Sequence, residues 1–398
     1  RSKQEAAKQN PGIYGEFAAH RKLSLEDVEA NIKAGKPYVL RLKSDGNPDP
    51  EKARRIKVED AIRGTLEMPE NFQDVVILKT TGIPTYHFAH VVDDHLMRTT
   101  HVIRGEEWLP SLPIHVELFE KLGFELPVYC HTAQLMKIGE DGNKRKLSKR
   151  KDPELSLDYY RDQGYHPAAV REYLLTILNS NYEEWRMENP EADIDEFKFT
   201  TEKMSNSGAL FDLDKLNDVS KEAMLHIPAP KIAEFLQEWS LEFAPEYGYI
   251  FDDMGLLVKI LDLGRDEKKP RKDLVYARQI MEFISYFYDQ SFKVIDEVPA
   301  EAEADKVKIL EEYLSSYNHA DTQEEWFNKI REIATNLGYA AKPKDYKKNP
   351  DDYKGHVGHV STVIRLALVG RAQSPDVWAI QQIMGEEMTR RRITSYEI

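Results

Sequence analysis

The densest cluster of charge in this sequence is a run at residues 144–151, where six of eight side chains are basic. Such a run cannot be packed into a core, because burying an unpaired charge is strongly unfavourable. It must lie in a loop that faces either water or an anion. The charges alone allow a solvated surface loop, and they also allow a loop that binds an anion.

Two predicted strands, at residues 101–104 and 127–131, flank a predicted helix. Strand, helix, strand is the pattern of a parallel βαβ unit. In such sheets ligands bind at the carboxyl ends of the strands. The side chains that follow these strand ends are predicted to converge on one crevice with the basic run: Arg104, Glu107, Leu135 and Met136.

Two further side chains join this set from a helix predicted to open at Pro84. Tyr86 and His90 share one face of that helix at i and i+4. Ordinary structural interpretations also exist. Tyr86 and His90 are consistent with half-buried helix residues, Arg104 with pairing to a neighbouring carboxylate, and Glu107 with a helix-start carboxylate. Their joint placement around one sheet edge favours a function.

The elements before this set are predicted to form a small mixed α/β unit over residues 1–83. Ser24 and Asp27 have the spacing of a capping box at a helix start. Alternation at residues 38–43 is typical of a strand, and the apolar run at 75–78 predicts a strand buried on both faces. No catalytic cluster is found in this stretch.

After residue 151 the predicted pattern is helical to the end of the chain. Apolar residues recur at helical spacing, and we interpret these stripes as the core of a helical bundle. Residues 183–200 are acidic and polar and predict a long loop, and residues 341–355 predict a linker. The predicted fold class is therefore α/β followed by all-α.

The composition restricts the class of protein. The 398 residues are enough for roughly two to four domains, and no apolar run approaches the ~20 residues of a membrane span. Cys130 is the single cysteine, so an intrachain disulfide and a cysteine-ligated zinc site are excluded, and a cytoplasmic location is predicted. The net charge of −14 argues against non-specific nucleic-acid binding but allows a local basic track.

Four segments, taken in order, resemble the bacterial-type glutamyl-tRNA synthetases, a family of class I aminoacyl-tRNA synthetases. They lie at residues 84–94, 102–108, 146–151 and 208–216. The third, which begins Lys146-Leu147-Ser148-Lys149-Arg150, resembles the Lys-Met-Ser-Lys-Ser type loop that closes over the phosphates of ATP in this family. The resemblance extends over essentially the whole chain.

The resemblance implies the second half of a class I Rossmann-type catalytic domain with a small α/β insertion unit, followed by helical bundle domains for the tRNA stem and anticodon. It places the C-terminal part of the connective, acceptor-binding insertion at residues 1–83 and the second catalytic half at 84–151. A stem-contact helical region follows at 152–218, and two anticodon-binding helical subdomains at 219–300 and 301–398. A helical C-terminal half favours glutamyl over eukaryotic-type glutaminyl enzymes.

The family activates glutamate with ATP to glutamyl-adenylate and transfers it to the terminal ribose of tRNA. Position by position, the resemblance assigns glutamate binding to Tyr86, His90 and Arg104, although the position of His90 is often Asn in the family. An arginine fork grips a carboxylate in two places, which suits Arg104 to the side-chain carboxylate of glutamate. The resemblance assigns the ATP side to Glu107, Trp108, Leu135, Met136, Lys146 and Lys149.

Lys146 and Lys149 are the catalytic candidates, and Lys149 is expected to stabilise charge as pyrophosphate leaves. Arg365 matches an arginine that reads the last anticodon base in some members, with a salt-bridged helix arginine as the structural alternative. ATP with Mg²⁺ is implied, without a dedicated metal site on the protein. A monomer that binds glutamate-accepting tRNA is expected, and acceptance of glutamine tRNA stays open.

The sequence departs from the family at its front. The His-Ile-Gly-His type motif of the family is not found before Tyr86. The segment His356-Val357-Gly358-His359 follows the basic run, whereas the family motif precedes it, so we interpret it as a chance match. The chain opens on Arg1 and not Met, and we expect that an N-terminal portion is missing and that this polypeptide alone forms no adenylate. The alternatives are a tRNA-binding protein without activating chemistry and an enzyme specific for glutamine.

Overall fold

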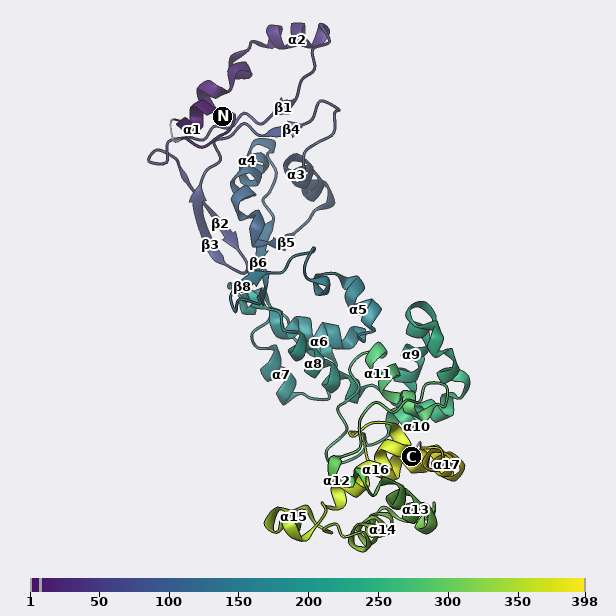
Figure 1. Cartoon of the computed structure of the whole chain (residues 1–398). Helices are drawn as coiled ribbons and strands as arrows, with labels where there is room; N and C mark the ends of the chain where they lie inside the picture. Colours follow the sequence, from purple (N-terminus) through teal and green to yellow (C-terminus); the bar gives the residue numbers. More distant parts are fainter. Residues whose placement is uncertain (1, 7–8, 397–398) are drawn as a thin grey trace. The chain divides into compact units, whose positions relative to one another are not determined.

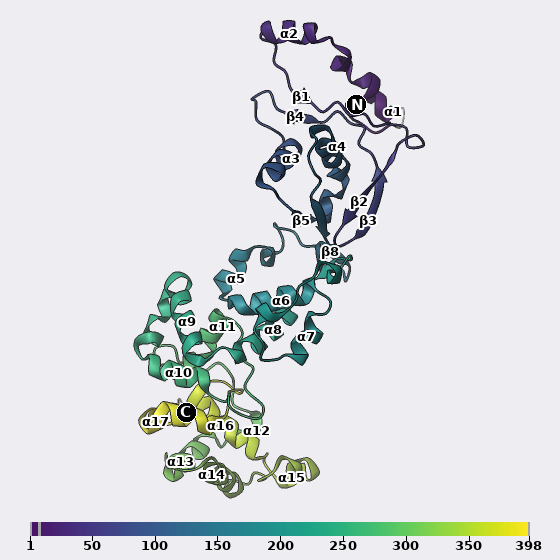
Figure 2. The same cartoon turned by 180° about the vertical axis from the view of Figure 1, so that it is seen from behind.

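The structure, a computed structural model, describes residues 2–6 and 9–396 (Figures 1 and 2). The chain divides into two compact units. Unit 1 consists of Arg1–Leu147 and Leu175–Phe211, and unit 2 consists of Ser148–Leu174 and Asp212–Ile398. The chain therefore passes from one unit to the other inside the basic run at residues 144–151.

Unit 1 mixes short strands and helices. Its strands are β1 (Leu40–Arg41), β2 (Arg55–Asp60), β3 (Gly64–Pro69), β4 (Val76–Leu78), β5 (His101–Gly105), β6 (Val128–Thr132), β7 (Leu135–Ile138), β8 (Lys144–Lys146) and β9 (Ala209–Leu210). Its α-helices are α1 (Ser2–Ala6), α2 (Leu25–Lys33), α3 (Tyr86–Met97), α4 (Leu112–Leu122) and α7 (Tyr182–Glu188). Short 3-10 helices complete it: η1 (Gly15–Phe17), η2 (Ala19–Lys22), η3 (Glu106–Ser111), η5 (Ile194–Glu196) and η6 (Thr201–Lys203).

The strands of unit 1 form three sheets, and the largest positions the candidate site. Its order is β3-β2-β6-β5, with β2 and β3 antiparallel and β6 parallel to both β2 and β5. The predicted strand, helix, strand unit is β5–α4–β6, and it is parallel as expected. Small antiparallel and mixed sheets, β1-β4 and β8-β7-β9, flank it in sequence.

Several predicted elements differ from the observed ones, among them residues 341–355, predicted as a linker, which carry the helix α15 (Pro343–Lys348). The predicted strand at 38–43 is reduced to β1, and β4 is half-buried and not buried on both faces, because these two short strands pair only with each other. The helix predicted to open at Pro84 begins at Tyr86, since Pro84 forms an isolated bridge with Leu78. The stretch 183–200, predicted as a long loop, carries most of α7 and all of η5.

Unit 2 is helical. Its α-helices are α5 (Leu157–Gln163), α8 (Leu213–His226), α9 (Ala229–Phe243), α10 (Met254–Asp262), α11 (Ala277–Ile284), α12 (Ala300–Glu303), α13 (Lys306–Ser316), α14 (Gln323–Asn336), α15 (Pro343–Lys348), α16 (Val357–Val369) and α17 (Val377–Thr394, kinked at Gly385). Its 3-10 helices are η4 (Pro153–Leu155), η7 (Pro245–Asp252), η8 (Ser285–Phe287) and η9 (Pro350–Asp352). The helix α6 (Pro167–Leu178) begins in unit 2 and ends in unit 1.

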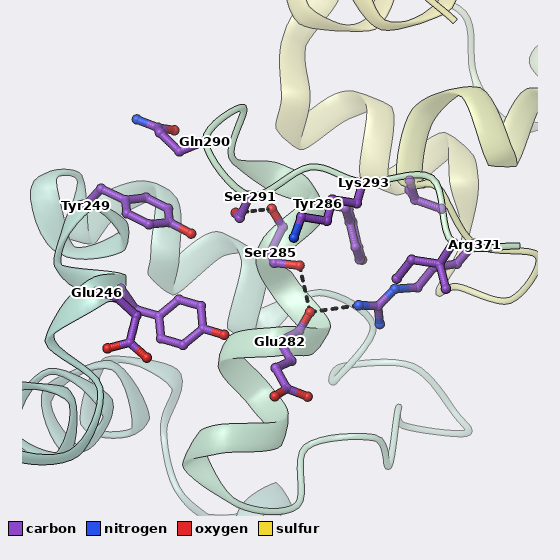
Figure 3. Close-up of a pocket in the computed structure, with 12 residues that line it drawn as sticks. Glu246, Tyr249, Glu282, Ser285, Tyr286, Gln290, Ser291, Lys293 and Arg371 are labelled. Atoms are coloured by element: carbon purple, nitrogen blue, oxygen red, sulfur yellow. Dashed lines mark hydrogen bonds between the residues drawn. The ribbon is translucent and has the colours of Figure 1, made fainter. Parts of the chain in front are cut away.

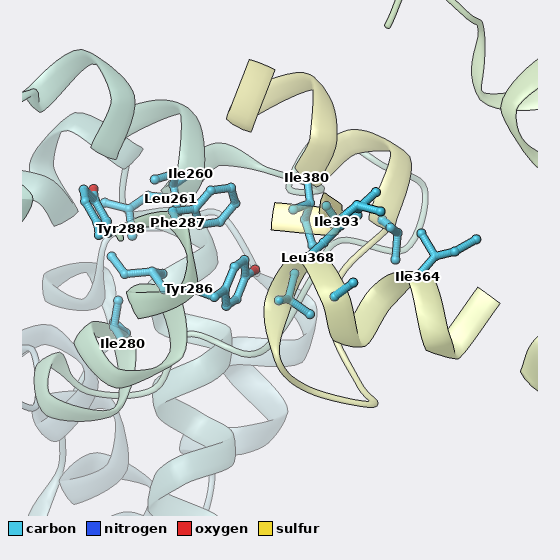
Figure 4. Packing of buried hydrophobic residues seen from close by; sticks show 14 of the residues in the cluster. Ile260, Leu261, Ile280, Tyr286, Phe287, Tyr288, Ile364, Leu368, Ile380 and Ile393 are labelled. Atoms are coloured by element: carbon cyan, nitrogen blue, oxygen red, sulfur yellow. The ribbon is translucent and has the colours of Figure 1, made fainter. Parts of the chain in front are cut away.

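The apolar stripes predicted as bundle core are buried. Ile232, Leu236 and Trp239 belong to one cluster with Ile280, Phe287, Ile364 and Ile380, part of which is drawn in Figure 4. In unit 1 a smaller cluster joins Val58 of β2, Leu112 of α4 and Tyr129 of β6. This second cluster fixes the sheet against α4 and so fixes the strand ends. Among the described residues, no helix has the length and apolar character needed to cross a membrane.

Candidate active site

Arg104 and His131 lie side by side at the carboxyl ends of β5 and β6, where the parallel register pairs them directly. Parallel strands leave their carboxyl ends at one edge of the sheet, and in α/β sheets this edge binds ligands. The following residue of β5, Gly105, leads straight into η3, which carries Glu107 and Trp108. Arg104 and Glu107 therefore lie at the carboxyl end of β5, whereas Leu135 and Met136 belong to β7 in the separate sheet β8-β7-β9.

The guanidinium of Arg104 is held by neighbours that carry no negative charge. Its Nε donates to Nε2 of His131 at 2.9 Å, and its Nη1 lies 3.1 Å from Nδ1 of His115. The guanidinium carbon lies 4.7 Å from the ring centroid of Tyr129. Among the described residues its Nη2 is buried and has no hydrogen-bond partner. A buried donor without a partner is costly unless a ligand supplies the acceptor.

Tyr86 and His90 project from α3 toward the same place. Their rings are parallel and 5.6 Å apart, and Tyr86 also packs at 4.5 Å against the ring of Trp108. His90 is buried, with Nδ1 2.7 Å from Oδ2 of Asp94 and Nε2 3.1 Å from the hydroxyl of Tyr129. Burial lowers the pKa of His90 although Asp94 opposes that shift. These side chains form an aromatic wall beside Arg104, which lies within 5.9 Å of the Trp108 ring.

The residues predicted for the ATP side form a second group in unit 1. Met136 of β7 and Lys146 of β8 are directly paired in an antiparallel register, and Leu135 accepts the backbone N–H of Leu147 at 3.1 Å. Glu107 is exposed and accepts from Nε2 of Gln134 at 3.3 Å. Its own backbone N–H, then Gln134 and the charge of Lys146, hold the pKa of the Glu107 carboxyl below its usual value against a smaller effect of burial.

The basic run, predicted to be a loop, begins as strand β8 at residues 144–146, which pair with β7, and only then continues as a tight turn. Leu147 is buried, and the backbone N–H of Ser148 donates to Oδ2 of Asp152 at 2.7 Å. Asp152 returns its own backbone N–H to the carbonyl of Ser148 at 2.8 Å. Lys146 belongs to unit 1 and Lys149 to unit 2, and both are exposed. The turn therefore anchors its apolar residue and leaves the two lysines to solvent.

Arg365 lies on α16 in unit 2, apart in sequence from all other candidates. Its Nη1 donates to the carbonyl of Ala372 at 2.8 Å, and burial lowers the pKa of its guanidinium. Among the described residues its Nε is buried without a hydrogen-bond partner, and the charge of Asp376 opposes the effect of burial on its pKa.

The His-x-Gly-His segment has a structural role here. His356 is the N-cap of α16, and its Nδ1 accepts the backbone N–H of Gly358 at 2.9 Å. His359 accepts the backbone N–H of His356 at 3.4 Å, and the two rings stack at 4.0 Å. The spacing of the two histidines is thus the spacing of a capping box.

Three residues beside Arg104 were not predicted from the sequence. His131 ends β6, His115 lies in the middle of α4, and Asp60 ends β2. The signal for His131 was its place at the carboxyl end of a predicted parallel strand. For His115 and Asp60 no local signal exists, because both reach the site only through tertiary packing.

Unit 2 holds an open hollow of about 460 Å³ (Figure 3). Arg371 donates to the carbonyl of Glu282 at 2.9 Å, and Ser291 donates to the carbonyl of Ser285 at 2.9 Å. Two acidic and two basic side chains line it, Glu246 and Glu282 with Lys293 and Arg371. The charges of this wall favour neither an anion nor a cation. Over residues 2–6 and 9–396, no group of three or more His, Cys, Asp or Glu side chains has the arrangement of a metal site.

Comparison with known protein families assigns two segments of the chain. Residues 1–218 match the model of the catalytic domain of class I tRNA synthetases (E and Q), and residues 350–396 match an anticodon binding domain. A glutamate–tRNA ligase of Acetivibrio thermocellus is 60% identical over 395 residues, which cover 99% of this chain and 71% of that protein. A glutamate–tRNA ligase of Clostridium perfringens is 47% identical over 399 residues, covering 99% of this chain and 72% of that protein.

Solved structures agree with these sequence relatives on the fold. The glutamate-tRNA synthetase of Elizabethkingia anophelis superposes with a TM-score of 0.70 at 25% identity. The superposition covers 99% of this chain and 76% of the other.

Proposed function

We propose that this chain, which belongs to the class I tRNA synthetases for glutamate and glutamine, is a glutamate–tRNA ligase. The observation that carries the proposal is the state of Arg104. Its guanidinium is surrounded by uncharged rings, forms no ion pair with a described carboxylate, and keeps a buried Nη2 without a partner. Such a group favours an anionic ligand with two oxygens, and the side-chain carboxylate of glutamate is one.

The proposed reaction has two steps. The α-carboxylate of glutamate attacks the α-phosphorus of ATP, which forms glutamyl-adenylate and releases pyrophosphate. A hydroxyl of the terminal tRNA ribose then attacks the acyl carbon, which forms the ester and releases AMP. Neither step needs a protein nucleophile, so the contribution of the protein is positioning and electrostatic stabilisation.

Tyr86 and His90 are proposed to position glutamate on Arg104. The aromatic wall that they form with Trp108 supports this role, because it excludes water from one side of the guanidinium. Glu107, Trp108, Leu135 and Met136 are proposed to hold ATP.

Lys146 and Lys149 are proposed to stabilise the charge on the departing pyrophosphate. Their exposure in a turn with a buried Leu147 supports a phosphate contact. Mg²⁺ is expected to arrive with the phosphates of ATP.

The helical unit is proposed to bind tRNA, with Arg365 at the anticodon. The guanidinium of Arg365 donates one recorded hydrogen bond, from Nη1 to Ala372, and its remaining donors suit the edge of an unstacked base. We further propose that the protein acts as a monomer in the cytoplasm and uses glutamate-accepting tRNA. Whether glutamine tRNA is also charged is decided by an assay with both tRNAs.

The test is aminoacylation by the whole natural protein with glutamate and, separately, with glutamine. Arg104→Gln is expected to raise the KM for glutamate roughly 100-fold, because two charge-assisted hydrogen bonds are lost. Arg104→Lys keeps the positive charge but not the forked guanidinium, and it is expected to raise the KM for glutamate by an intermediate amount. Arg98→Gln, at the exposed end of α3, is the matched control. An unchanged KM for glutamate in Arg104→Gln contradicts the proposal.

A second candidate function is tRNA binding without activation. It is favoured by one observation, that no His-Ile-Gly-His type segment precedes Tyr86 in the 398 residues. We infer that these residues by themselves form no adenylate. Pyrophosphate exchange with the 398-residue polypeptide tests this directly, and detectable exchange refutes it. Retention of tRNA by the same polypeptide, with no exchange, is the expected result.

A further inference from the structure

Two buried side chains, Asp60 and His131, form a chain of hydrogen bonds that ends on the half-buried Arg104. Oδ2 of Asp60 lies 2.6 Å from Nδ1 of His131, and Nε2 of His131 accepts from Nε of Arg104 at 2.9 Å. The side chains of Asp60 and His131 are completely buried. Asp60 comes from β2, His131 from β6 and Arg104 from β5, so the chain runs across three neighbouring strands of one sheet region.

The protons of this chain are fixed by the chemistry of arginine. A guanidinium only donates hydrogen bonds, so Nε2 of His131 must accept and the ring must be neutral with its proton on Nδ1. That proton is donated to Asp60. The remaining acceptor positions of Asp60 are filled by three backbone N–H groups, of Ile62 at 3.0 Å, Arg63 at 3.0 Å and His131 at 3.1 Å. The negative charge therefore stays on Asp60, one ring away from the guanidinium.

Burial alone would raise the pKa of the Asp60 carboxyl. The hydrogen bonds from His131 and from the three amides outweigh burial and leave that pKa below its usual value. Asp60 is thus an ionised acceptor that orients His131. In metal sites, a carboxylate behind a metal-binding histidine orients that ring in the same way.

His115 holds the other side of the guanidinium in the same manner. Its Nδ1 accepts from Nη1 of Arg104, so its proton lies on Nε2, which is 3.0 Å from Nδ1 of His87. Burial lowers the pKa of His115 to about 2, and the ring is neutral. Two neutral rings therefore orient the guanidinium, and neither cancels its charge.

We propose that Asp60, His131 and His115 are positioning residues that orient Arg104 through neutral acceptors and reserve its full charge for a substrate carboxylate. The inference rests on the proposed function and deepens it, since it names the residues that set the preference for glutamate over glutamine. Nε is occupied by His131 and one hydrogen of Nη1 by His115, so the fork proposed for the substrate carboxylate consists of the buried Nη2 and the second hydrogen of Nη1.

The preference for glutamate over glutamine follows from the charge of the side chain and from the number of hydrogen-bond donors that it carries. A carboxylate neighbour would neutralise the guanidinium and weaken its attraction for a second carboxylate. A carboxamide brings no charge, and its NH₂ group would face the donors of Arg104. When the wrong substrate leaves a buried polar group of the site without a hydrogen-bond partner, the site discriminates strongly against that substrate.

The test compares paired variants of the whole natural protein in aminoacylation with glutamate and with glutamine. His131→Leu removes the acceptor, and His131→Gln replaces it with an amide oxygen. We expect His131→Leu to raise the KM for glutamate roughly tenfold with a smaller change in kcat, and to lower the glutamate-to-glutamine ratio of kcat/KM by a similar factor. His131→Gln is expected to stay within about threefold of wild type. His101→Gln, an exposed histidine of β5, is the control.

A spectroscopic measurement tests the positions of the protons separately from activity. Imidazole ¹⁵N spectra of the wild type are expected to show His131 protonated on Nδ1 and not on Nε2. In Asp60→Asn the Ile62 and Arg63 amides keep the amide oxygen, so the NH₂ group faces His131 and moves its proton to Nε2. That variant is expected to reproduce the KM of His131→Leu. If Asp60→Asn does not fold, the comparison of His131→Leu with His131→Gln tests the proposal on its own.

The outcomes separate the two proposals. A wild-type protein that charges tRNA with glutamate, together with an unchanged substrate ratio in His131→Leu, overturns the inference and leaves the proposed function standing. A proton on Nε2 of His131 in the wild type also overturns it. A wild-type protein that does not charge tRNA with glutamate overturns the proposed function, and the inference falls with it.

Discussion

The imidazole of His90 is parallel to the phenol ring of Tyr86, with centroids 5.6 Å apart and planes within 4°. The two residues differ in exposure, since His90 is buried and Tyr86 is 49% exposed. The buried ring is fixed by Asp94 and Tyr129, and it provides a rigid support for the exposed one. Tyr86 is therefore held in one orientation while it faces solvent.

Replacing Tyr86 tests whether that orientation serves glutamate. We expect Tyr86→Ala to raise the KM for glutamate by roughly tenfold, because the stacked contact of about 1 kcal/mol and any hydroxyl contact are lost together. Tyr86→Phe keeps the stacked contact and is expected to raise the KM for glutamate by a smaller factor. Leu96→Ala, an exposed residue of the same helix, is the control. Equal KM values in all three would place Tyr86 outside the glutamate site.

The lysines of the basic run are expected to act on the chemical step. Lys149→Ala should lower kcat roughly 100-fold with little change in the KM for glutamate, because the charge of the leaving pyrophosphate appears only in the transition state. Lys146→Ala is expected to lower kcat and to weaken ATP binding as well. Lys151→Ala removes a charge from the same exposed turn and serves as the control. An equal effect of all three variants would indicate a general effect of charge.

Arg365 is expected to affect tRNA and not glutamate. Arg365→Gln should raise the KM for tRNA roughly tenfold, since a guanidinium contact to a base edge contributes about 1–3 kcal/mol. The KM for glutamate should stay unchanged. Arg331→Gln, on the exposed face of α14, is the control. A lowered melting temperature with parallel losses for both substrates would instead assign Arg365 to packing through Ala372.

The neutral His115 makes stability depend on pH. Burial lowers its pKa to about 2, whereas an unfolded histidine takes up a proton near pH 6.5. Between these values the unfolded chain binds one proton more, so the free energy of unfolding decreases on acidification, by about 1.4 kcal/mol per pH unit for this group.

We therefore expect His115→Gln to flatten the pH dependence of the free energy of unfolding below about pH 6. Urea titrations at several pH values measure this slope for the wild type and the variant. The exposed His101→Gln should leave the slope unchanged. Parallel slopes in wild type and His115→Gln would mean that His115 is protonated in the folded protein.

Elements with local signals could be predicted from the sequence. The capping box of Ser24 and Asp27 is present with both of its hydrogen bonds, and α4 ends at Gly123 in the left-handed conformation that favours glycine. The parallel pair β5 and β6 also followed from the pattern. These features depend on residues close together in the chain.

The supports of Arg104 could not be predicted in the same way. Asp60 and His131 are 71 residues apart, and their contact depends on β2 joining β6, which no periodicity encodes. The same reason explains the short β1, since the length of a strand is decided by its partner and not by its own alternation. Arg104 itself could be placed at a strand end, but its lack of a carboxylate partner emerged only from the packing.

The attachment of β2 to the sheet has an evolutionary consequence. The β2–β3 hairpin lies within residues 1–83 and touches β6 in register at one pair, Asp60 with Tyr129. A hairpin from the stretch that we expect to be the insertion thus supplies Asp60, which supports Arg104 through His131. Recombination that exchanged residues 1–83 between family members would therefore also exchange Asp60. We expect residue identities at positions 60 and 131 to be inherited together.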